Sequence, residues 1–362
     1  MPKIRIREKD RTQGVLTSTN NTVIFLTDTG FKKGAPELVK SGKGLTNEEI
    51  IDKIISFGGK VVVGKDYATS ADYLKDRNQY DVKFLLVKEG SAEDTDLKKA
   101  IDVVLSRRDC AVVYSKTTPE YSENELSVLK TGVSGNLDDT DTDGFMSKET
   151  KSYAGKYVLP FYGNSLTLSG TSFDAGLAYI LAFLSSARTN AEWLAVAGSK
   201  RGVIPVDLTV GALSESTLDT MQPRGTGTAI NPIVNMNPWG VRIWGNRTAL
   251  TLPTAEGDEN LVASSFANVR VLICDIKKKL YEAARKYQFE QNTDVLWVNF
   301  QSSVNTLLEE MVQSYGIAGY KWIKEETSEK AKLKAILRII PIEAIEDFDL
   351  TLELTDSLEV TE

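Results

Sequence analysis

The chain has 362 residues, with 43 Lys plus Arg, 50 Asp plus Glu and no His, which gives a formal net charge of −7. The lack of His excludes Ser-His-Asp and Cys-His nucleophiles and His-ligated metal sites, because each needs an imidazole. Cys110 and Cys274 are too few for a four-thiolate site, and we expect both to be buried. An acidic chain is poorly suited to bind nucleic acid, and the longest apolar run, at residues 176–184, is too short to span a membrane.

The first third of the chain has the pattern of an α/β domain. Residues 3–7 alternate basic and apolar side chains, which predicts a half-buried strand with a basic outer face. Between residues 22 and 114, short apolar runs then alternate with helical patterns. The expected strands are residues 22–28, 60–63, 82–87 and 111–114, and the expected helices start after Thr46 or Asn47 and lie near residues 97–105.

The rest of the chain is more varied. Residues 129–155 are polar and rich in Gly, Asp, Ser and Thr, so we expect a surface excursion there. Residues 172–188 repeat Leu and Ile at helical spacing, which predicts a helix with an apolar stripe. Further expectations are a strand at 156–161, a loop at 205–235, a strand at 240–245, long helices at 266–287 and 297–315, and a strand at 348–354.

Two segments have the spacing of ligand-binding motifs. Residues 59–65 match a phosphate-binding loop in spacing, but three central valines and Asp66 in the hydroxyl position favour a helix-ending Gly pair followed by a strand. Asp139, Asp141 and Asp143 match the start of a calcium-binding loop, although its twelfth position holds a Thr, and a solvated acidic loop is the preferred interpretation. We therefore expect no catalytic residue and no cofactor, and only these three aspartates as metal candidates.

The two ends of the chain carry opposite charge. The first strand is basic, whereas the segment from residue 342 onward contains acidic residues and no basic one. Such strands can be donated to the sheet of a neighbouring copy, and complementary charge would favour pairing of one end with the other. Pairing within one chain, or fraying, are the alternatives. The residues concerned are Lys3, Ile4, Arg5, Ile6 and Arg7, and Asp349, Leu350, Leu352, Glu353 and Leu354.

A series of motifs resembles the contractile-tail sheath proteins of bacteriophages. Residues 235–248 resemble the family's Gly-rich "WG-x-R-T" signature, and residues 289–297 its "FE-x-N…W" segment. Residues 268–271, 315–319 and 176–195 are similar to further family segments, in the family's order. Asn246 and Val271 depart from the usual Ala and Arg. The matching motif residues are Trp239, Gly240, Trp244, Gly245, Arg247, Thr248, Phe289, Glu290, Asn292 and Trp297.

Physical chemistry suggests structural roles for these residues. Trp239 and Trp244 lie five apart in a strand-like run, so we expect them on opposite faces, packed in the core. The glycines beside them permit close backbone approach. Arg247 is expected to bridge a carboxylate, with Glu290 as its partner.

The resemblance implies a conserved inner α/β domain built from both chain ends, an outer α/β domain, and terminal strands that extend the sheets of neighbours. The implied parts are an N-terminal exchange arm (1–20), an outer domain (21–228), an inner sheath domain (229–341) and a C-terminal exchange arm (342–362).

A sheath subunit would form stacked rings, hexameric by resemblance, around a tail tube, and would contract to drive that tube through an envelope. The implied partners are other copies, the tube protein, and baseplate and terminator proteins, without direct nucleic acid contact or membrane insertion, in a virion tail assembled in the host cytoplasm. Lys277, Lys278 and Lys279 could face an acidic tube, although a solvated helix face is the simpler interpretation. The alternative function is a cytoplasmic α/β enzyme for a nucleotide or sugar.

Reversing the charge of the first strand should block polymerisation if the ends pair with each other. We expect Lys3→Glu, Arg5→Glu and Arg7→Glu together to prevent polymer formation, because the acidic end would then be repelled. Adding Asp349→Lys and Glu353→Lys should partly restore polymers, as measured by sedimentation. A complete lack of rescue would show that the complementary charges are incidental.

Overall fold

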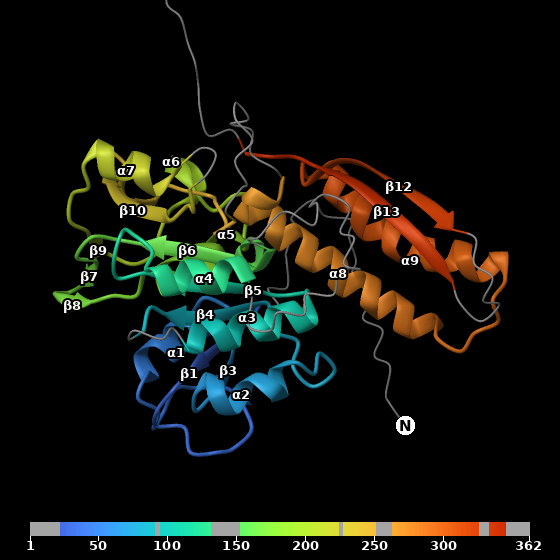
Figure 1. Ribbon diagram of the computed structural model, residues 1–362, viewed down its shortest axis with the longest axis horizontal. Helices are drawn as coiled ribbons and strands as arrows, with labels where there is room; N and C mark the ends of the chain where they lie inside the picture. The colour runs from blue at the N-terminus through green and yellow to red at the C-terminus, as the bar shows by residue number, and fades with distance from the viewer. Residues whose placement is uncertain are drawn as a thin grey trace, which may run out of the picture.

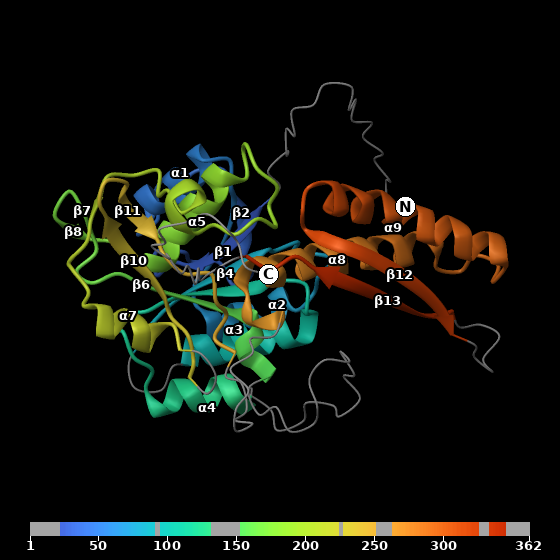
Figure 2. The same ribbon diagram turned by 90° about the horizontal axis from the view of Figure 1, so that it is seen from above.

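The apolar runs of the first half of the chain form a mostly parallel sheet. The computed structural model describes residues 22–90, 95–131, 153–223, 227–250, 263–325 and 333–344. An eight-stranded sheet has the order β11-β10-β6-β5-β4-β1-β3-β2 (Figures 1 and 2). Its strands are β1 (Val23–Thr27), β2 (Glu37–Val39), β3 (Lys60–Gly64), β4 (Phe84–Lys88), β5 (Ala111–Ser115), β6 (Val158–Tyr162), β10 (Asn231–Met236) and β11 (Gly240–Ile243).

Helices cover both faces of this sheet. All strand pairs are parallel except those made by β2 and β11, the two edge strands. One core cluster packs the sheet against α1 (Glu48–Ser56) and α5 (Ala175–Ser186), and the other packs it against α2 (Tyr67–Leu74) and α3 (Thr95–Arg107). All five residues of β5 are consequently buried.

Shorter elements complete this body. Residues 175–184 of α5 are all buried, so this helix is enclosed on every side and not only along one stripe. The remaining elements are α4 (Glu123–Thr131), α6 (Gly198–Arg201), α7 (Glu215–Met221), the 3₁₀ helices η1 (Tyr153–Tyr157) and η2 (Ala263–Ser265), and a three-stranded sheet of β7 (Thr167–Leu168), β8 (Thr171–Ser172) and β9 (Leu208–Thr209).

The C-terminal unit projects from the body. It consists of α8 (Ala267–Tyr287), α9 (Asp294–Gln313), β12 (Ile317–Glu325) and β13 (Lys334–Pro341). The long helix α8 begins against the body and leads outward, α9 returns beside it, and the two strands lie along the helices (Figures 1 and 2). The two strands form a separate two-stranded sheet.

Most of the expected elements are present, and the α/β class is confirmed for the body. The expected strand at residues 60–63 is β3, with its valines buried, which confirms the strand interpretation over the phosphate loop. The loop expected at 205–235 is wrong, because α7 and β10 lie within it. The sheet also continues across residue 228, where a domain boundary was expected, because β10 pairs with β6.

Several expectations lie outside the described residues. They concern the first strand (Lys3, Ile4, Arg5, Ile6, Arg7), the acidic loop (Asp139, Asp141, Asp143) and the last strand (Asp349, Leu350, Leu352, Glu353, Leu354). Among the helices that are described, none combines the length and the apolar character that a membrane crossing requires.

Truncating the enclosed helix should destabilise the body. Leu181 of α5 is fully buried, so Leu181→Ala should lower the free energy of unfolding by about 2–5 kcal/mol. Leu38 of β2 is 59% exposed, and Leu38→Ala is the matched control, expected to change stability by no more than about 0.5 kcal/mol. Urea denaturation of monomeric protein measures both. Equal effects would contradict the placement of α5 in the core.

Candidate assembly site

A buried charge cluster joins the C-terminal unit to the body. Lys83, next to β4, forms ion pairs with Glu192 and with Asp275 of α8, the latter at 3.0 Å. The lysine side chain is 7% exposed. Burial opposes its charge, but the two carboxylates outweigh this and raise the pKa of Lys83 above its usual range. The pKa of Asp275 is also raised, because this carboxyl group is buried and lies near Glu192.

The contact continues along one face of α8. Lys278 pairs with Asp81, and Asn78 Oδ1 accepts hydrogen bonds from Tyr281 Oη at 3.1 Å and Arg285 Nη1 at 2.6 Å. The α8 residues are spaced three and four apart, as on one helix face, while their partners run backward along residues 78–83. We call this set of contacts, from Lys83 to Asn78, the α8 seam. It sets the direction in which α8 leaves the body.

The helical hairpin has its own apolar core. Leu272 and Ile276 of α8 pack with Val304, Leu308 and Met311 of α9, all nearly or fully buried. This second core stabilises the C-terminal unit, which lies outside the two cores of the main sheet.

Aromatic side chains attach β12 to α9. Trp322 of β12 meets Trp297 edge to face at 5.7 Å between ring centroids and Phe300 at 5.8 Å. Its indole Nε1 donates a hydrogen bond of 2.8 Å to Asn305 Oδ1. One face of the two-stranded sheet is thereby packed on the helices.

The other face and both long edges of this sheet are open within the described part of the chain. β12 and β13 pair antiparallel with each other and with no other described strand. Ile336 and Ile340 on the open face are 39% and 64% exposed. A two-stranded sheet is marginally stable by itself, and an unprotected edge is a template for strands of other chains. This sheet is the candidate assembly site.

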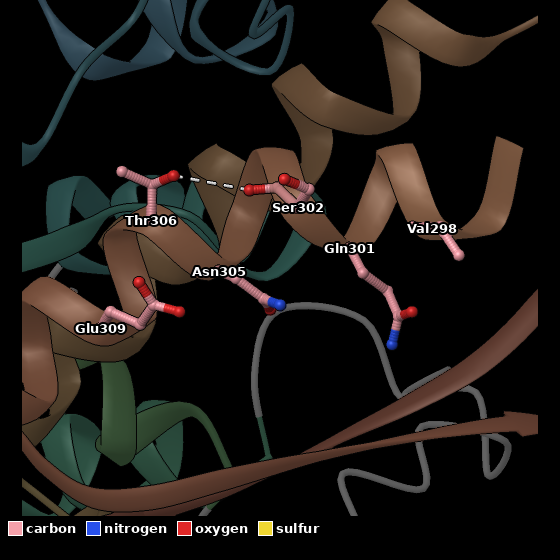
Figure 3. A pocket seen from close by; sticks show the side chains of 6 residues that line it. All are labelled: Val298, Gln301, Ser302, Asn305, Thr306 and Glu309. Atoms are coloured by element: carbon pink, nitrogen blue, oxygen red, sulfur yellow. Dashed lines mark hydrogen bonds between the residues drawn. The ribbon is translucent and has the colours of Figure 1, made fainter. Parts of the chain in front are cut away.

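A shallow polar groove of about 240 Å³ runs along α9 (Figure 3). Figure 3 shows its side chains arranged in a stripe along one face of the helix. They are Val298, Gln301, Ser302, Asn305, Thr306 and Glu309. Because this surface is open and contains one carboxylate, it has the character of a contact surface more than of a catalytic cleft.

Side chains at the carboxyl ends of β4 and β5 form a network of ion pairs and hydrogen bonds with one another. In α/β enzymes, this edge of the sheet commonly binds ligands. Lys116 is buried and pairs with Glu89 and Glu125, and Tyr114 Oη donates a hydrogen bond of 2.7 Å to Glu125 Oε1. Thr117 donates to Glu89. Each of these polar groups is engaged inside the protein, so the network stabilises the fold.

The expectation that both tryptophans of the "WG" motif are core residues is wrong. Trp239 is 48% exposed and Trp244 is 39% exposed. They lie just before and just after β11, an edge strand, so part of each ring is left uncovered. Gly240 has φ +77°, a left-handed conformation that favours glycine.

The second half of this motif is buried. A Cβ on Gly245 would lie 2.7 Å from Asn231 Oδ1, so this close approach requires glycine. Asn231 also binds both backbone groups of Arg247, donating to its carbonyl at 2.8 Å and accepting from its N–H at 2.6 Å. Thr248 Oγ1 donates to the Ser264 carbonyl at 2.9 Å. Sequence reasoning did not single out Asn231, the buried amide that holds this segment together.

The expected bridge between Arg247 and Glu290 is wrong. The Arg247 backbone pairs with Phe266 at the start of α8, whereas Glu290 follows the end of the same helix. A helix of 21 residues separates the two by about 30 Å. Arg247 instead lies over the Phe266 ring, 5.6 Å from its centroid.

The "FE-x-N…W" segment forms the tip of the helical hairpin. Phe289 is 96% exposed, and Glu290 and Asn292 are also exposed, whereas Trp297 packs on Phe300. The motif therefore lies at the turn between α8 and α9.

The three consecutive lysines of α8 do not form a free basic patch. Lys277 lies 5.9 Å from the Tyr157 ring centroid, and Lys278 is part of the α8 seam. Lys279 is 41% exposed and lies 3.9 Å from Glu282. Contact of this stretch with a tube stays a prediction.

The cysteines are buried, as expected, and burial raises the pKa of Cys110 to about 12 and that of Cys274 to about 11. Among the described residues, no cluster of three or more Cys, Asp or Glu side chains is placed to hold a metal ion.

The fold is that of subunits from contractile injection systems. A chain of the anti-feeding prophage baseplate, in a 6-fold symmetrised cryo-EM structure, is similar with a TM-score of 0.66 and 13% identity over 98% of this chain and 99% of that one. A chain of the contracted sheath complex of PVC, an extracellular contractile injection system, has a TM-score of 0.64 and 16% identity over 99% and 98%. The contracted helical sheath of the anti-feeding prophage gives 0.59 and 14% over 98% and 99%.

These similarities cover the full chain and show a shared fold. No family model matches the sequence, and no curated protein matches it significantly.

Removing the cation of the buried cluster should weaken the junction between the body and α8. Lys83→Met removes the buried cation that the largely buried carboxylates of Glu192 and Asp275 share, and we expect a loss of about 3–5 kcal/mol of stability. Lys278→Met breaks a pair whose partner Asp81 is 57% exposed, and should cost less than about 1 kcal/mol. Urea denaturation of the two variants as monomers measures both losses of stability. Equal losses would show that the buried cluster has no special role.

Proposed function

We propose that this chain is the structural subunit of the sheath of a contractile tail or injection machine. Copies would polymerise as stacked rings, hexameric by analogy, around a tail tube and contract to drive the tube through a target envelope. The similarity of the full chain to subunits of two contractile injection systems supports this proposal. So do the motifs at residues 235–248 and 289–297.

The observation that carries the proposal is the open two-stranded sheet of β12 and β13. Its free edges can accept strands, and both ends of the chain have the alternating pattern of strands. Main-chain hydrogen bonds between copies would persist while other surfaces rearrange, as a contracting polymer requires. The terminal segments would act as exchange arms, and the C-terminal unit, with the 229–250 segment, as the inner domain.

The proposed partners are other copies of the chain, a tail tube, and baseplate and tail-terminator proteins. The work is mechanical, so the proposal includes no catalytic residue, cofactor, nucleic acid contact or membrane insertion. Such a subunit would be part of a virion tail or a related particle, after assembly in the host cytoplasm.

Assembly should depend on both ends of the chain. Purified full-length protein should form tubular polymers that are visible by negative-stain microscopy. Deleting residues 1–11 or residues 348–362 should abolish the tubes and leave a folded monomer, because the body and C-terminal unit have their own cores. Circular dichroism is the control for folding. Full-length protein that stays monomeric at high concentration would contradict the proposal.

A further inference from the structure

Donors from three consecutive residues converge on the carboxylate of Glu89, the residue that follows β4. The backbone N–H groups of Thr117 and Thr118 both donate to Glu89 Oε2, the second of them at 3.1 Å. Thr117 Oγ1 donates to the same oxygen, and Thr118 Oγ1 donates to Oε1 at 2.9 Å. The Lys116 ammonium group also donates to Oε1. One carboxylate thus accepts two backbone and three side-chain hydrogen bonds.

This set of donors has the chemistry of an oxyanion-binding site. Successive backbone N–H groups that point at one oxygen form an anion-binding concavity, and a lysine together with Ser or Thr hydroxyls completes many sites that hold phosphate groups. The position fits as well, because residues 116–118 directly follow β5, and open α/β sheets bind ligands beyond the carboxyl ends of their strands. We call these three residues the 116–118 loop.

The 116–118 loop is anchored by contacts other than those with Glu89. Lys116 N donates a hydrogen bond of 2.8 Å to the Phe161 carbonyl of β6. The Lys116 side chain is fully buried, pairs also with Glu125, and its Nζ lies 5.0 Å from the Tyr121 ring centroid. These contacts hold the ammonium group in place when the Glu89 carboxylate is removed.

The loop faces solvent on its threonine side. Thr117 and Thr118 are exposed, whereas the Glu89 side chain is 13% exposed. Burial opposes the charge of Glu89, but the hydrogen bonds from Lys116 and Thr117 outweigh this and lower the pKa of its carboxyl group. Glu89 is therefore ionised at neutral pH, so an anion already occupies a position that solvent reaches.

We propose that the 116–118 loop is an oxyanion-binding site whose built-in occupant is the Glu89 carboxylate. Glu89 N donates to the Ser115 carbonyl at 2.8 Å, which tethers this carboxylate beside the loop and gives it a higher effective concentration than a dilute free anion. The wild-type chain consequently excludes phosphate. When the carboxylate is removed, inorganic phosphate binds in its place through the same N–H, hydroxyl and ammonium groups. This inference does not rest on the proposed sheath function.

Removing the occupant tests the inference in the full-length chain. Glu89→Ala should lower the melting temperature in chloride buffer, and inorganic phosphate should raise it again by about 2–4 °C with a saturable concentration dependence. The wild-type chain should show no saturable response. Isothermal titration calorimetry should detect phosphate binding to the variant and not to the wild type. Sodium chloride at equal ionic strength accounts for general salt effects.

Two further variants separate an opened site from a lost charge. Glu89→Gln loses the charge but leaves an amide group in the site, so it should not bind phosphate. Asp72→Ala removes a carboxylate that is 89% exposed and pairs with Lys75, and it is the matched control for net charge. Neither variant should respond to phosphate in a saturable way.

Glu89→Ser is measured in place of Glu89→Ala if the alanine variant does not fold. Absence of saturable phosphate binding to the variant that folds, or equal binding to the wild type or to Asp72→Ala, would overturn the inference. Failure of both variants to fold even in phosphate would also overturn it, because the loop would then be no preformed site. Each of these results leaves the sheath proposal intact, since polymer formation is measured separately.

Discussion

The arrangement of the molecule depends on the ion pairs that Lys83 forms with Glu192 and Asp275. Lys83 joins the start of β4 to α8 through Asp275, and to the segment after α5 through Glu192. Removing this buried lysine would take away the cation that holds the two carboxylates close together. Because the α8 seam continues from this point to Asn78, the helix leaves the body in one direction. The position of the β12–β13 sheet follows from that direction.

A sheet of two strands has little stability alone, and here the α8–α9 core supports one of its faces. Within the described part of the chain, both outer edges of this sheet are unpaired. A polymer with two states needs subunits that move as rigid bodies and stay connected, and a packed body with an open sheet can provide both.

Much of the fold could be predicted from local patterns. The buried parallel strands are continuous apolar runs, and α8 and α9 have strong helical periodicity, so both kinds of element were expected correctly. The sequence pattern of residues 205–235 indicates a loop because α7 is only seven residues long and polar, and β10 contains a proline. Periodicity is weak over such short elements.

The site was harder to predict. The pairing of β12 with β13 and the contact of Lys83 with Asp275 join residues far apart in the chain, and no local pattern encodes them. The size of Trp239 and Trp244 favours a place in the core, but the edge strand β11 leaves both partly exposed. The opposite charges of the two chain ends, in contrast, are evident from the sequence itself.

A helical cryo-EM reconstruction of polymers assembled from the purified chain tests the sheath role most directly. We expect tubes in which terminal strands from other copies extend the β12–β13 sheet. Polymers in which β12 and β13 have no added strand, or a chain that remains monomeric at all concentrations, would contradict the sheath role.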